Sequence, residues 1–547
     1  MRARLRPITR LPSLLATVLL LSCGGGGGGG GATDPEPPTA GGPGVRISGA
    51  SPVAAGCDGG RRDDLIFVGA EVEPWAAVSP ADPNRLVAVW QQDRSDTGGA
   101  RALASARSTD GGRSWQLQLQ PMSRCGGAAP GSAGDHERVT DPWVDIGPDG
   151  TVHLMGLAIT GNSFAPGSSN AMLAQRSTDG GATWSPPAVL LRDGPAFFND
   201  KNTLTADPTD ARLVYAVWDR LDSIGNGPTM LARSTDGGLS WEPARAIFAP
   251  QVVGGVSQTI GNRIVVITAG PERGTLVNVF TQIDSVVTGS SARVRVQRST
   301  DRGATWSDPI TVADWRSVGT TDPETGAAVR GGAGAPAVAT GPSGELWVAW
   351  QDARFSGGRR DAIALSRSTD GGRSWSAPVA ASRDASVAAF LPALAVRADG
   401  TLALLYVDLR SNTADRATLL ADLWLATTSD GTAWSETALA RAFDLDRAAA
   451  ARGGRFLGDY QALVVAGSRW LAVAALPGLG AAGDASDVHA LPAPAFGSSA
   501  YVARDAGALE MEPGFERARQ AALRRALDAR RGREAARGSP GSGSAVL

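Results

Sequence analysis

The sequence predicts an all-β fold, a β-propeller of four-stranded blades, and three observations lead to that prediction. A short motif ending in tryptophan recurs along the chain, and a pair of short apolar strands precedes each copy. The 547 residues include 70 glycines and 34 prolines, which supply the turns that many short strands need. With 42% hydrophobic and 19% charged residues, the chain has ample material for a large buried core.

The recurring motif reads Arg-Ser-Thr-Asp-Gly-Gly-Arg-Ser-Trp over residues 107–115, and its six copies lie 57 to 69 residues apart. The aspartate can accept hydrogen bonds from the N–H groups of its own turn, and glycine supplies the positive φ that the turn requires. The tryptophan would bury a large apolar face between neighbouring sheets. We therefore predict that each copy is a structural hairpin turn, pinned by Asp110, Asp179, Asp236, Asp301, Asp370 and Asp430.

Each motif completes a unit that reads strand, turn, strand, loop, strand, motif turn, strand. Strand pairs start near residues 72, 139, 202, 260, 335, 392 and 460, which predicts seven blades. The last unit lacks the motif. A strand at Asp487–Leu491 would continue it, and a strand at Leu65–Val68 would close the ring beside it. From Glu512 a thin apolar stripe predicts a short C-terminal helix that ends near Arg537.

The N-terminus has the pattern of an export signal. Four arginines flank or precede a short apolar run over Leu11–Leu21, and Leu-Leu-Ser-Cys23 resembles the bacterial lipobox. That resemblance implies lipidation of Cys23 and anchoring to the outer membrane or cell surface; an ordinary signal peptide with an incidental cysteine is the alternative. The expected organisation is a signal peptide at 1–22, a lipid-anchored flexible linker at 23–60, the propeller at 61–505 and a C-terminal tail with the helix at 506–547.

The net charge, the cysteines and the histidines limit the classes of partner, metal and cofactor that we expect. A formal net charge of −2 argues against a nucleic-acid partner, and beyond the lipid anchor we expect no membrane contact and a monomer. Cys57 and Cys125 remain after export and predict a disulfide in an oxidising compartment, with two buried thiols as the alternative. The three histidines share no metal-ligand spacing, and no phosphate or dinucleotide loop occurs, so we expect no metal and no cofactor.

The motif Ser-x-Asp-x-Gly-x-Thr-Trp resembles the Asp-box, or bacterial neuraminidase repeat, of sialidases and related propellers. The resemblance covers most of residues 70–480 and implies a cell-surface propeller directed at glycans. Two functions follow from it, an exo-α-sialidase-type glycoside hydrolase or a non-catalytic protein that binds carbohydrate or protein. The resemblance also makes six blades, the number in sialidases, the alternative to seven. Function is expected where the central channel opens, opposite the Asp-box turns.

Sialidase chemistry requires a tyrosine nucleophile, an acidic group and arginines that clamp a carboxylate. The resemblance implies Tyr460 as the nucleophile, because the following Gln-Ala-Leu is similar to the family's sequence there, with Asp141 or Asp93 as the acid. The family's Arg-Ile-Pro motif is missing near the start. The place of the base that would activate the tyrosine reads Phe390-Leu-Pro-Ala393. Without that base, Tyr460 would remain a phenol with a pKa of about 10.

The candidate ligand-binding residues are mostly arginines. Arg410 and Arg354 resemble clamp arginines, although an Asp/Arg pattern follows the second strand in several blades and an interblade ion pair is the alternative for each. Charged residues that occur only once at the expected mouth include Glu71, Glu73 and Asp459, to which we assign no role. Those that we expect to bind a ligand are Arg138, Asp200, Lys201 and Arg455, with solvated loops as the alternative.

Overall fold

The computed structural model describes residues 44–60, 64–332, 334–478, 485–493, 499–506 and 509–531. The expected signal peptide, the lipidation site Cys23 and most of the expected linker lie outside this part of the chain, as does the tail beyond Arg531. Within the part that the structure describes, no helix is both long enough and apolar enough to cross a bilayer.

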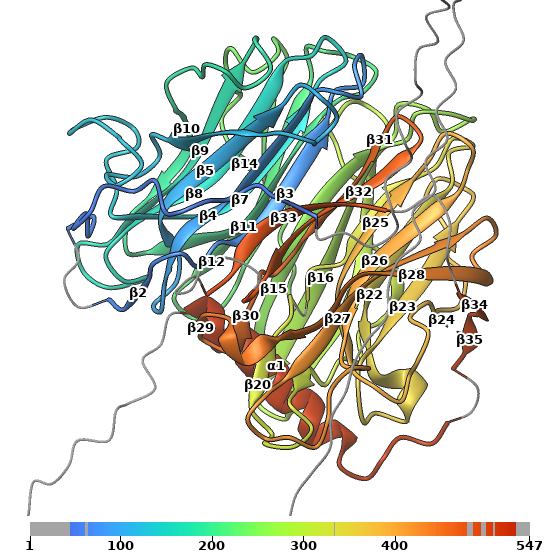
Figure 1. The fold of residues 1–547 in the computed structure, drawn as a ribbon. Coiled ribbons are helices and arrows are strands. Elements are labelled where there is room, and N and C mark those ends of the chain that lie inside the picture. The colour runs from blue at the N-terminus through green and yellow to red at the C-terminus, as the bar shows by residue number, and fades with distance from the viewer. Residues whose placement is uncertain are drawn as a thin grey trace, which may run out of the picture. The chain divides into compact units, whose positions relative to one another are not determined.

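The chain is an all-β propeller of four-stranded antiparallel units (Figure 1). Units 1 and 2 share one bridge between Ala100 and Val139 and so form one larger sheet. Unit 1 contains β3 (Val72–Val78), β4 (Leu86–Ser95), β5 (Ala100–Ser108) and β6 (Gln116–Gln120), and unit 2 contains β7 (Arg138–Ile146), β8 (Val152–Thr160), β9 (Ser169–Ser177) and β10 (Ala188–Asp193). Unit 3 contains β11 (Phe197–Ala206), β12 (Val214–Asp222), β13 (Thr229–Ser234) and β14 (Arg245–Phe248), and unit 4 contains β15 (Gly255–Val266), β16 (Leu276–Val286), β17 (Gly289–Ser299) and β18 (Ile310–Asp314).

Units 5 and 6 each gain a fifth strand from the C-terminal segment, whereas unit 7 takes its outer strand from the N-terminal segment. The strands are β21 (Ala337–Thr340), β22 (Leu346–Asp352), β23 (Ala362–Ser368), β24 (Val379–Ala380) with β35 (Arg504–Asp505); β25 (Ala389–Val396), β26 (Leu402–Asp408), β27 (Leu420–Thr428), β28 (Ala433–Asp444) with β34 (Ser499–Val502); and β31 (Ala462–Ala466), β32 (Arg469–Leu476), β33 (Asp487–Pro492) with β1 (Val45–Arg46).

The innermost strands surround one channel. Among the described residues β3, β7, β11, β15, β21, β25 and β31 contact one another in chain order, and β31 contacts β3. Figure 1 shows this closure, with the orange-red strands β31 and β32 beside the blue strand β3. The strands are almost wholly buried because each blade packs both faces on its neighbours, with large side chains such as Trp90 and Trp218 between them.

The Asp-box turns have the hydrogen bonds that their sequence predicts. In the first, Asp110 Oδ1 accepts from the backbone N–H of Arg113 at 3.0 Å and of Ser114 at 2.9 Å, and Ser108 Oγ donates to the same oxygen at 2.8 Å. The hydroxyl of Ser114 and these N–H groups hold the pKa of Asp110 well below its usual range. The indole N–H of Trp115 donates to Gly112 O at 3.0 Å, which fixes the ring against its own turn.

The strand expected to close the ring was assigned wrongly. Ile66–Phe67, strand β2, pairs with β4 of unit 1. The closing strand is β1, which pairs with β33 through Val45 and Arg46. Arg46 Nε donates to Asp487 Oδ1 at 2.6 Å and strengthens this pairing. The error arose because two residues of pairing leave almost no hydrophobic pattern in a sequence, whereas the longer apolar run at Leu65–Val68 is more conspicuous.

The segment between β1 and β3 is tied down by a disulfide. Cys57 and Cys125 are bonded, with their Cα atoms 5.8 Å apart. The bond joins the segment that precedes unit 1 to the loop that follows β6. Val53, Ala102 and Cys125 form a small buried cluster beside it.

Short elements lie at one end of the channel. A small sheet contains β19 (Thr320–Thr321), β20 (Ala328–Arg330), β30 (Gly454–Phe456) and β29 (Ala450–Ala451). Two short 3-10 helices occupy Ala353–Ser356 and Leu445–Arg447, and helix α1 runs over Phe515–Arg531. Helix α1 buries Leu523 and Leu527 against unit 4, and Gln520 exchanges hydrogen bonds with the backbone of Ser290. A helix thus follows Glu512, as the sequence predicts, and its expected end near Arg537 lies outside the described residues.

Candidate functional site at the channel mouth

Most innermost strands begin with a β-bulge. The pairing register with the second strand shifts between Val72 and Trp75 in unit 1, and equivalent shifts occur in units 2, 3, 4 and 6. One residue of each bulge has a positive φ: Glu73, Asp141, Lys201, Gly261 and Leu391. A bulge turns a side chain away from the regular alternation of a strand. In units 1, 2 and 3 it directs Glu73, Asp141 and Lys201 toward the mouth of the channel.

Strained backbone coincides with charge in three of these bulges. Glu73, Asp141 and Lys201 have φ values of 54°, 50° and 50°, a region that costs about 1–2 kcal/mol for residues other than glycine. Unit 4 has glycine at this position, which adopts the conformation freely. Non-glycine residues held in such a conformation, with ionisable side chains, are a reason to look for function at this place.

Lys201 joins three carboxylates. Its Nζ lies 2.6 Å from Asp459 Oδ2, 2.8 Å from Asp141 Oδ1 and 3.4 Å from Glu73 Oε1. Asp459 also accepts a two-pronged contact from Arg330, with Nε to Oδ1 at 2.9 Å. Glu73 of unit 1, Asp141 of unit 2 and Asp459, which precedes unit 7, therefore converge on the ammonium group of unit 3, and Arg330 of the small sheet joins them through Asp459.

Burial sets the protonation of this cluster. Burial raises the pKa of Glu73 to about 7, against the opposing effect of Lys201. Burial alone would lower the pKa of Lys201, but Asp141, Asp459 and Glu73 raise it well above its usual value. Burial would raise the pKa of Asp459, but Arg330 and Lys201 hold it far below its usual range. At neutral pH the cluster thus contains the cations Lys201 and Arg330, the ionised carboxylate of Asp459 and the carboxyl group of Glu73, which is close to its titration point.

A hollow opens beside the cluster, which we call the mouth hollow; it is lined by Glu73, Arg94, Arg138, Asp141, Lys201 and Arg330. Asp200 also lines it. Phe456 of β30 lies between two of the arginines, with the Arg94 guanidinium 4.7 Å and the Arg330 guanidinium 4.5 Å from its ring centre. Arg94 Nη1 donates to Gln91 Oε1 at 2.6 Å, while its buried Nε has no partner among the described residues.

Arg138 and Asp200 are held at the edges of the mouth hollow. Arg138 donates from Nη1 to Thr97 Oγ1 at 2.9 Å and from Nη2 to the carbonyl of Gly161 at 2.8 Å. Asp200 Oδ1 accepts from the backbone N–H of Lys201 at 3.1 Å. Of the ligand-binding residues expected from sequence, Arg138, Asp200 and Lys201 are therefore brought together.

Tyr460 lies deeper in the channel and is packed by aromatic rings. Trp75 and Trp143 stack with ring centres 3.7 Å apart, and Tyr460 meets both edge-on. Its hydroxyl donates to the backbone carbonyl of Pro142 at 3.0 Å. Burial, followed by the charges of Glu73 and Asp141, raises the pKa of Tyr460 well above its usual value. The phenolate form that a nucleophile needs is therefore strongly disfavoured.

The remaining sequence candidates do not line the mouth hollow. Asp93 accepts from Ser51 Oγ at 2.6 Å, from Gly69 N at 3.0 Å and from Arg101 at 3.1 Å, and so fixes the N-terminal segment. Arg354 Nη2 lies 2.8 Å from Asp352 of its own loop. Arg455 Nε lies 3.2 Å from Asp446.

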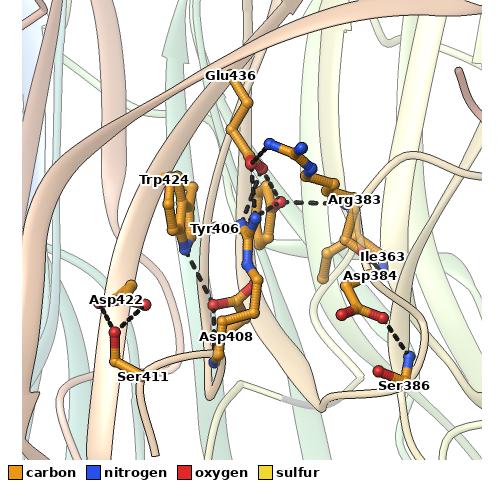
Figure 2. A network of polar contacts seen from close by, with 12 residues as sticks. Ile363, Arg383, Asp384, Ser386, Tyr406, Asp408, Ser411, Asp422, Trp424 and Glu436 are labelled. Atoms are coloured by element: carbon orange, nitrogen blue, oxygen red, sulfur yellow. Dashed lines mark hydrogen bonds and ion pairs between the residues drawn. The ribbon is translucent and has the colours of Figure 1, made fainter. Parts of the chain in front are cut away.

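Arg410 belongs to a separate network at the junction of units 5 and 6 (Figure 2). Its guanidinium lies 3.7 Å above the Trp424 ring, and it donates to Glu436 Oε2 at 2.7 Å and to Asp408 Oδ2 at 2.5 Å. The hydroxyl of buried Tyr406 donates to Glu436. In Figure 2 the side chain of Tyr406 is directed at Glu436 and that of Trp424 at Asp408. Arg410 and Tyr460 thus contact different sets of residues, and the structure does not bring them into one cavity.

Sequence reasoning placed Glu73 and Asp459 at the mouth without a role and missed Arg330. Arg94 was interpreted only as part of a repeated ion-pair pattern. One signal for Glu73 was present, because Glu73-Pro-Trp75 and Asp141-Pro-Trp143 are the same tripeptide type at the start of consecutive units. Nothing in the sequence signals Arg330, because it comes from an irregular insertion between units 4 and 5.

Residues 175–186, around the second turn, match the BNR/Asp-box repeat family. The chain carries Asp-box repeats. This agrees with the resemblance seen in sequence and with the all-β fold. No curated protein matches the chain in a sequence comparison.

Several solved structures resemble these Asp-box sheets. A Hadza microbial sialidase has 18% identity and a TM-score of 0.39, covering 62% of this chain and 64% of its own. An α-L-arabinanase from Penicillium chrysogenum has 14% identity and a TM-score of 0.42 over 63% of this chain and 94% of its own. A leech intramolecular trans-sialidase has 12% identity and a TM-score of 0.39, covering 84% of this chain and 70% of its own. The chain thus spans less than two thirds of that microbial sialidase, and similarity at this level assigns no activity.

Proposed function

We propose that the protein recognises acidic glycans at the mouth hollow. The observation that carries the proposal is the convergence of Arg94, Arg138 and Arg330 on one hollow together with Lys201. Guanidinium groups form paired hydrogen bonds with carboxylates, so three of them suit a sugar acid. The anchor expected at Cys23 would display this site at the cell surface, which is part of the same proposal.

Arg94 is the arginine best placed to bind an added anion. It is 3% exposed, and among the described residues its guanidinium forms no ion pair. Burial lowers its pKa, although the neighbouring charge of Glu73 opposes that effect. A buried cation without its own carboxylate partner is stabilised by a ligand that brings one.

The carboxyl groups of the hollow suit the hydroxyl groups of the same ligand. Asp141 and Asp200 can accept hydrogen bonds from sugar hydroxyls, and Thr140 offers a hydroxyl of its own. A sugar that carries both an acid group and hydroxyls would therefore find partners of each kind within one hollow.

Hydrolysis is the second candidate, and one observation favours it. Glu73 and Asp141 line the same hollow and both contact Lys201 Nζ, so the two contacting oxygens are at most about 6 Å apart, a limit that admits the separation of about 5–5.5 Å in retaining glycosidases. A carboxyl group with a pKa of about 7 can act as a general acid at neutral pH. In this scheme Tyr460 is a packing residue.

Calorimetric titration tests the binding proposal. Glucuronic acid, galacturonic acid and the methyl glycoside of sialic acid are the probes, with galactose as the neutral comparison. Arg94→Gln should weaken binding of an acidic probe by about 10-fold or more, the loss expected for one charge-assisted hydrogen bond. Arg220→Gln is the matched control, because Arg220 also lies over a phenylalanine ring, 3.6 Å from the centre of Phe197, but does not line the hollow. Equal effects of the two substitutions, or binding of galactose alone, would refute the proposal.

Turnover separates the two candidates. Purified wild type is offered fluorogenic sialosides, glucuronides and arabinofuranosides. If the hydrolase candidate is right, Glu73→Gln abolishes release of the fluorophore while retaining binding, and Tyr460→Phe leaves release intact. Absence of release from every substrate, combined with binding that depends on Arg94, leaves recognition as the function.

A further inference from the structure

A second hollow lies on the Asp-box side of the molecule, between the turns of units 2 and 3. We call it the box groove; it is lined by His153, Gln175, Arg176, Trp184, Leu239 and Trp241, among others. Its residues come from β8, β9 and the second and third Asp-box turns. Its cavity volume of about 360 Å³ falls in the range of small-molecule sites.

His153 breaks a packing rule that the other blades obey. The second glycine of the first five Asp-boxes, and the single glycine of the sixth, approaches the second residue of the second strand of the preceding unit, or the neighbour of that residue. That partner is apolar at most junctions, as in the approach of Gly181 to Val87 and of Gly372 to Val277. At the junction of units 2 and 3 the partner of Gly238 is the imidazole of His153. A histidine thus replaces an apolar residue in one blade only among these pairs.

Four polar atoms around the box groove have no partner among the described residues: His153 Nε2, Gln175 Oε1, Arg176 Nε and Trp184 Nε1. His153 and Gln175 are 1% and 3% exposed, so these groups are buried side chains that line a cavity. Burial lowers the pKa of His153 to about 4, so its ring is neutral at neutral pH and can accept or donate one hydrogen bond. Buried polar groups are normally satisfied, which points to something that fills the groove.

Arg176 differs from Arg298 of the fourth turn, and Trp184 differs from Trp115 and Trp306, although the indole N–H of Trp375 in the fifth turn also has no partner among the described residues. In the first and fourth Asp-boxes the indole N–H of Trp115 or Trp306 donates to a glycine carbonyl of its own turn, but that of Trp184 has no such partner. Arg298, which corresponds to Arg176, reaches across to the carbonyl of Gly371 in the next turn. Arg176 makes no side-chain hydrogen bond to described residues. Two donors that elsewhere stabilise the scaffold are therefore left for a ligand.

From these groups we infer that the box groove binds a pyranose sugar ring. Trp184 and Trp241 offer flat apolar faces on which the C–H face of a sugar can lie. Arg176 Nε and Trp184 Nε1 can donate to sugar oxygens, and Gln175 Oε1 can accept from a hydroxyl. The site is neutral apart from Arg176 and lies on a different face of the blades from the mouth hollow, so it is independent of the function proposed there.

The test uses the full protein with nitrogen-15 labelled tryptophan. The indole N–H signal of Trp184, assigned by its loss in Trp184→Phe, is followed by NMR. The probes are the methyl pyranosides of glucose, galactose, mannose and N-acetylglucosamine, at concentrations above the ~1 mM dissociation constant typical of a weak single-sugar site. At least one of these sugars should shift the Trp184 signal saturably. Glycerol, which has hydroxyls but no ring to stack, should not.

The blades themselves supply matched variants. Gln175→Ala should weaken sugar binding by about 5- to 10-fold, the effect of one lost neutral hydrogen bond. Gln297→Ala makes the same change at the equivalent place in unit 4, where Gln297 Nε2 donates to Ser307 O just as Gln175 Nε2 donates to Ser185 O. It should leave binding unchanged. His153→Val introduces the residue found at this place in unit 1 and so should fold and bind weakly.

Three outcomes would overturn the inference. No saturable shift with any of the four pyranosides means that the groove holds water only. An equal response to glycerol means that the groove does not recognise a ring. A shift that survives in Gln175→Ala and His153→Val places the sugar elsewhere. Arg94→Gln, which tests the mouth hollow, should not affect the Trp184 signal, so the two sites fail or succeed separately.

Discussion

The two sides of the channel mouth are built on the same backbone but carry different chemistry. In units 1, 2 and 3 the bulge position holds Glu73, Asp141 and Lys201, whereas in units 4 and 6 it holds Gly261 and Leu391. On the charged side the strained conformation accompanies an ion cluster. On the uncharged side it is relieved by glycine or covered by apolar packing. The repeat therefore fixes where a side chain points, and only departures from the repeat determine what it can do.

We expect the largest effect when a bulge residue of units 1 to 3 is replaced by its counterpart from units 4 or 6. Lys201→Leu places the residue of unit 6 in unit 3 and leaves Asp141, Asp459 and Glu73 without their shared cation. Breaking a buried ion cluster by removing one member typically costs about 3–5 kcal/mol, and we expect that loss in the free energy of unfolding by urea. Lys201→Leu combined with Asp141→Asn should recover part of it. A loss below about 1 kcal/mol, the value of surface ion pairs, would show that the cluster is solvated.

A second prediction concerns pH. The folded protein holds the proton of Glu73 up to about pH 7, whereas the unfolded chain releases it near 4.5, so folding takes up a proton between these values. The contribution of Glu73 to stability is therefore present at low pH and is lost as the pH rises through about 7. Between these limits the free energy of unfolding of wild type should fall relative to that of Glu73→Gln, by up to about 1.4 kcal/mol per pH unit. Denaturant titrations of both proteins at several pH values would measure the difference, and parallel curves would contradict it.

Sequence alone was sufficient for the repeated part of the molecule and insufficient for the irregular part. The Asp-box spacing and the strand pairs gave the blade, because each turn is determined by local residues such as Asp110 and its neighbours. The mouth cluster depends on Arg330 and Phe456, which come from insertions far apart in the chain and carry no periodic signal. Arg354 and Arg410 matched family patterns, but their carboxylate partners lie within their own units.

The third prediction tests how far a ligand extends from the mouth hollow toward helix α1. Helix α1 lines a hollow that shares Lys201 and Arg330 with the mouth hollow, and Ala526 is part of its wall. Ala526→Trp should fill that space and exclude any part of an acidic sugar that extends into it, which weakens binding by about 10-fold if roughly 1.4 kcal/mol of contacts are lost. Ala521 is exposed on the same helix and does not line the hollow, so Ala521→Trp is the control. Equal affinities of the two variants would show that the ligand does not extend from the mouth hollow to helix α1.

The smallest effect is expected at Tyr460. Tyr460→Phe removes one hydrogen bond to the Pro142 carbonyl and should cost about 0.5–1.5 kcal/mol in the free energy of unfolding. Sugar binding and any turnover should not change. Thermal unfolding and calorimetric titration would measure both. A loss of turnover with stability unchanged would restore the tyrosine to a catalytic role and would weaken the contrast between the two sides.

The pairing of strand β1 with β33 affects how the protein folds during its synthesis. The bond between Arg46 and Asp487 joins residues 441 positions apart, so β1 is synthesised long before β33, the strand with which it pairs. Contacts between residues this far apart in the sequence form slowly, because the entropy of closing a long loop is lost before the contacts add stability. Until β1 pairs, the outer edge of β33 in unit 7 has no partner strand, and the β1 of one copy of the protein can pair with the β33 of another. Completion of the outer edge of unit 7 is thus a late step of folding.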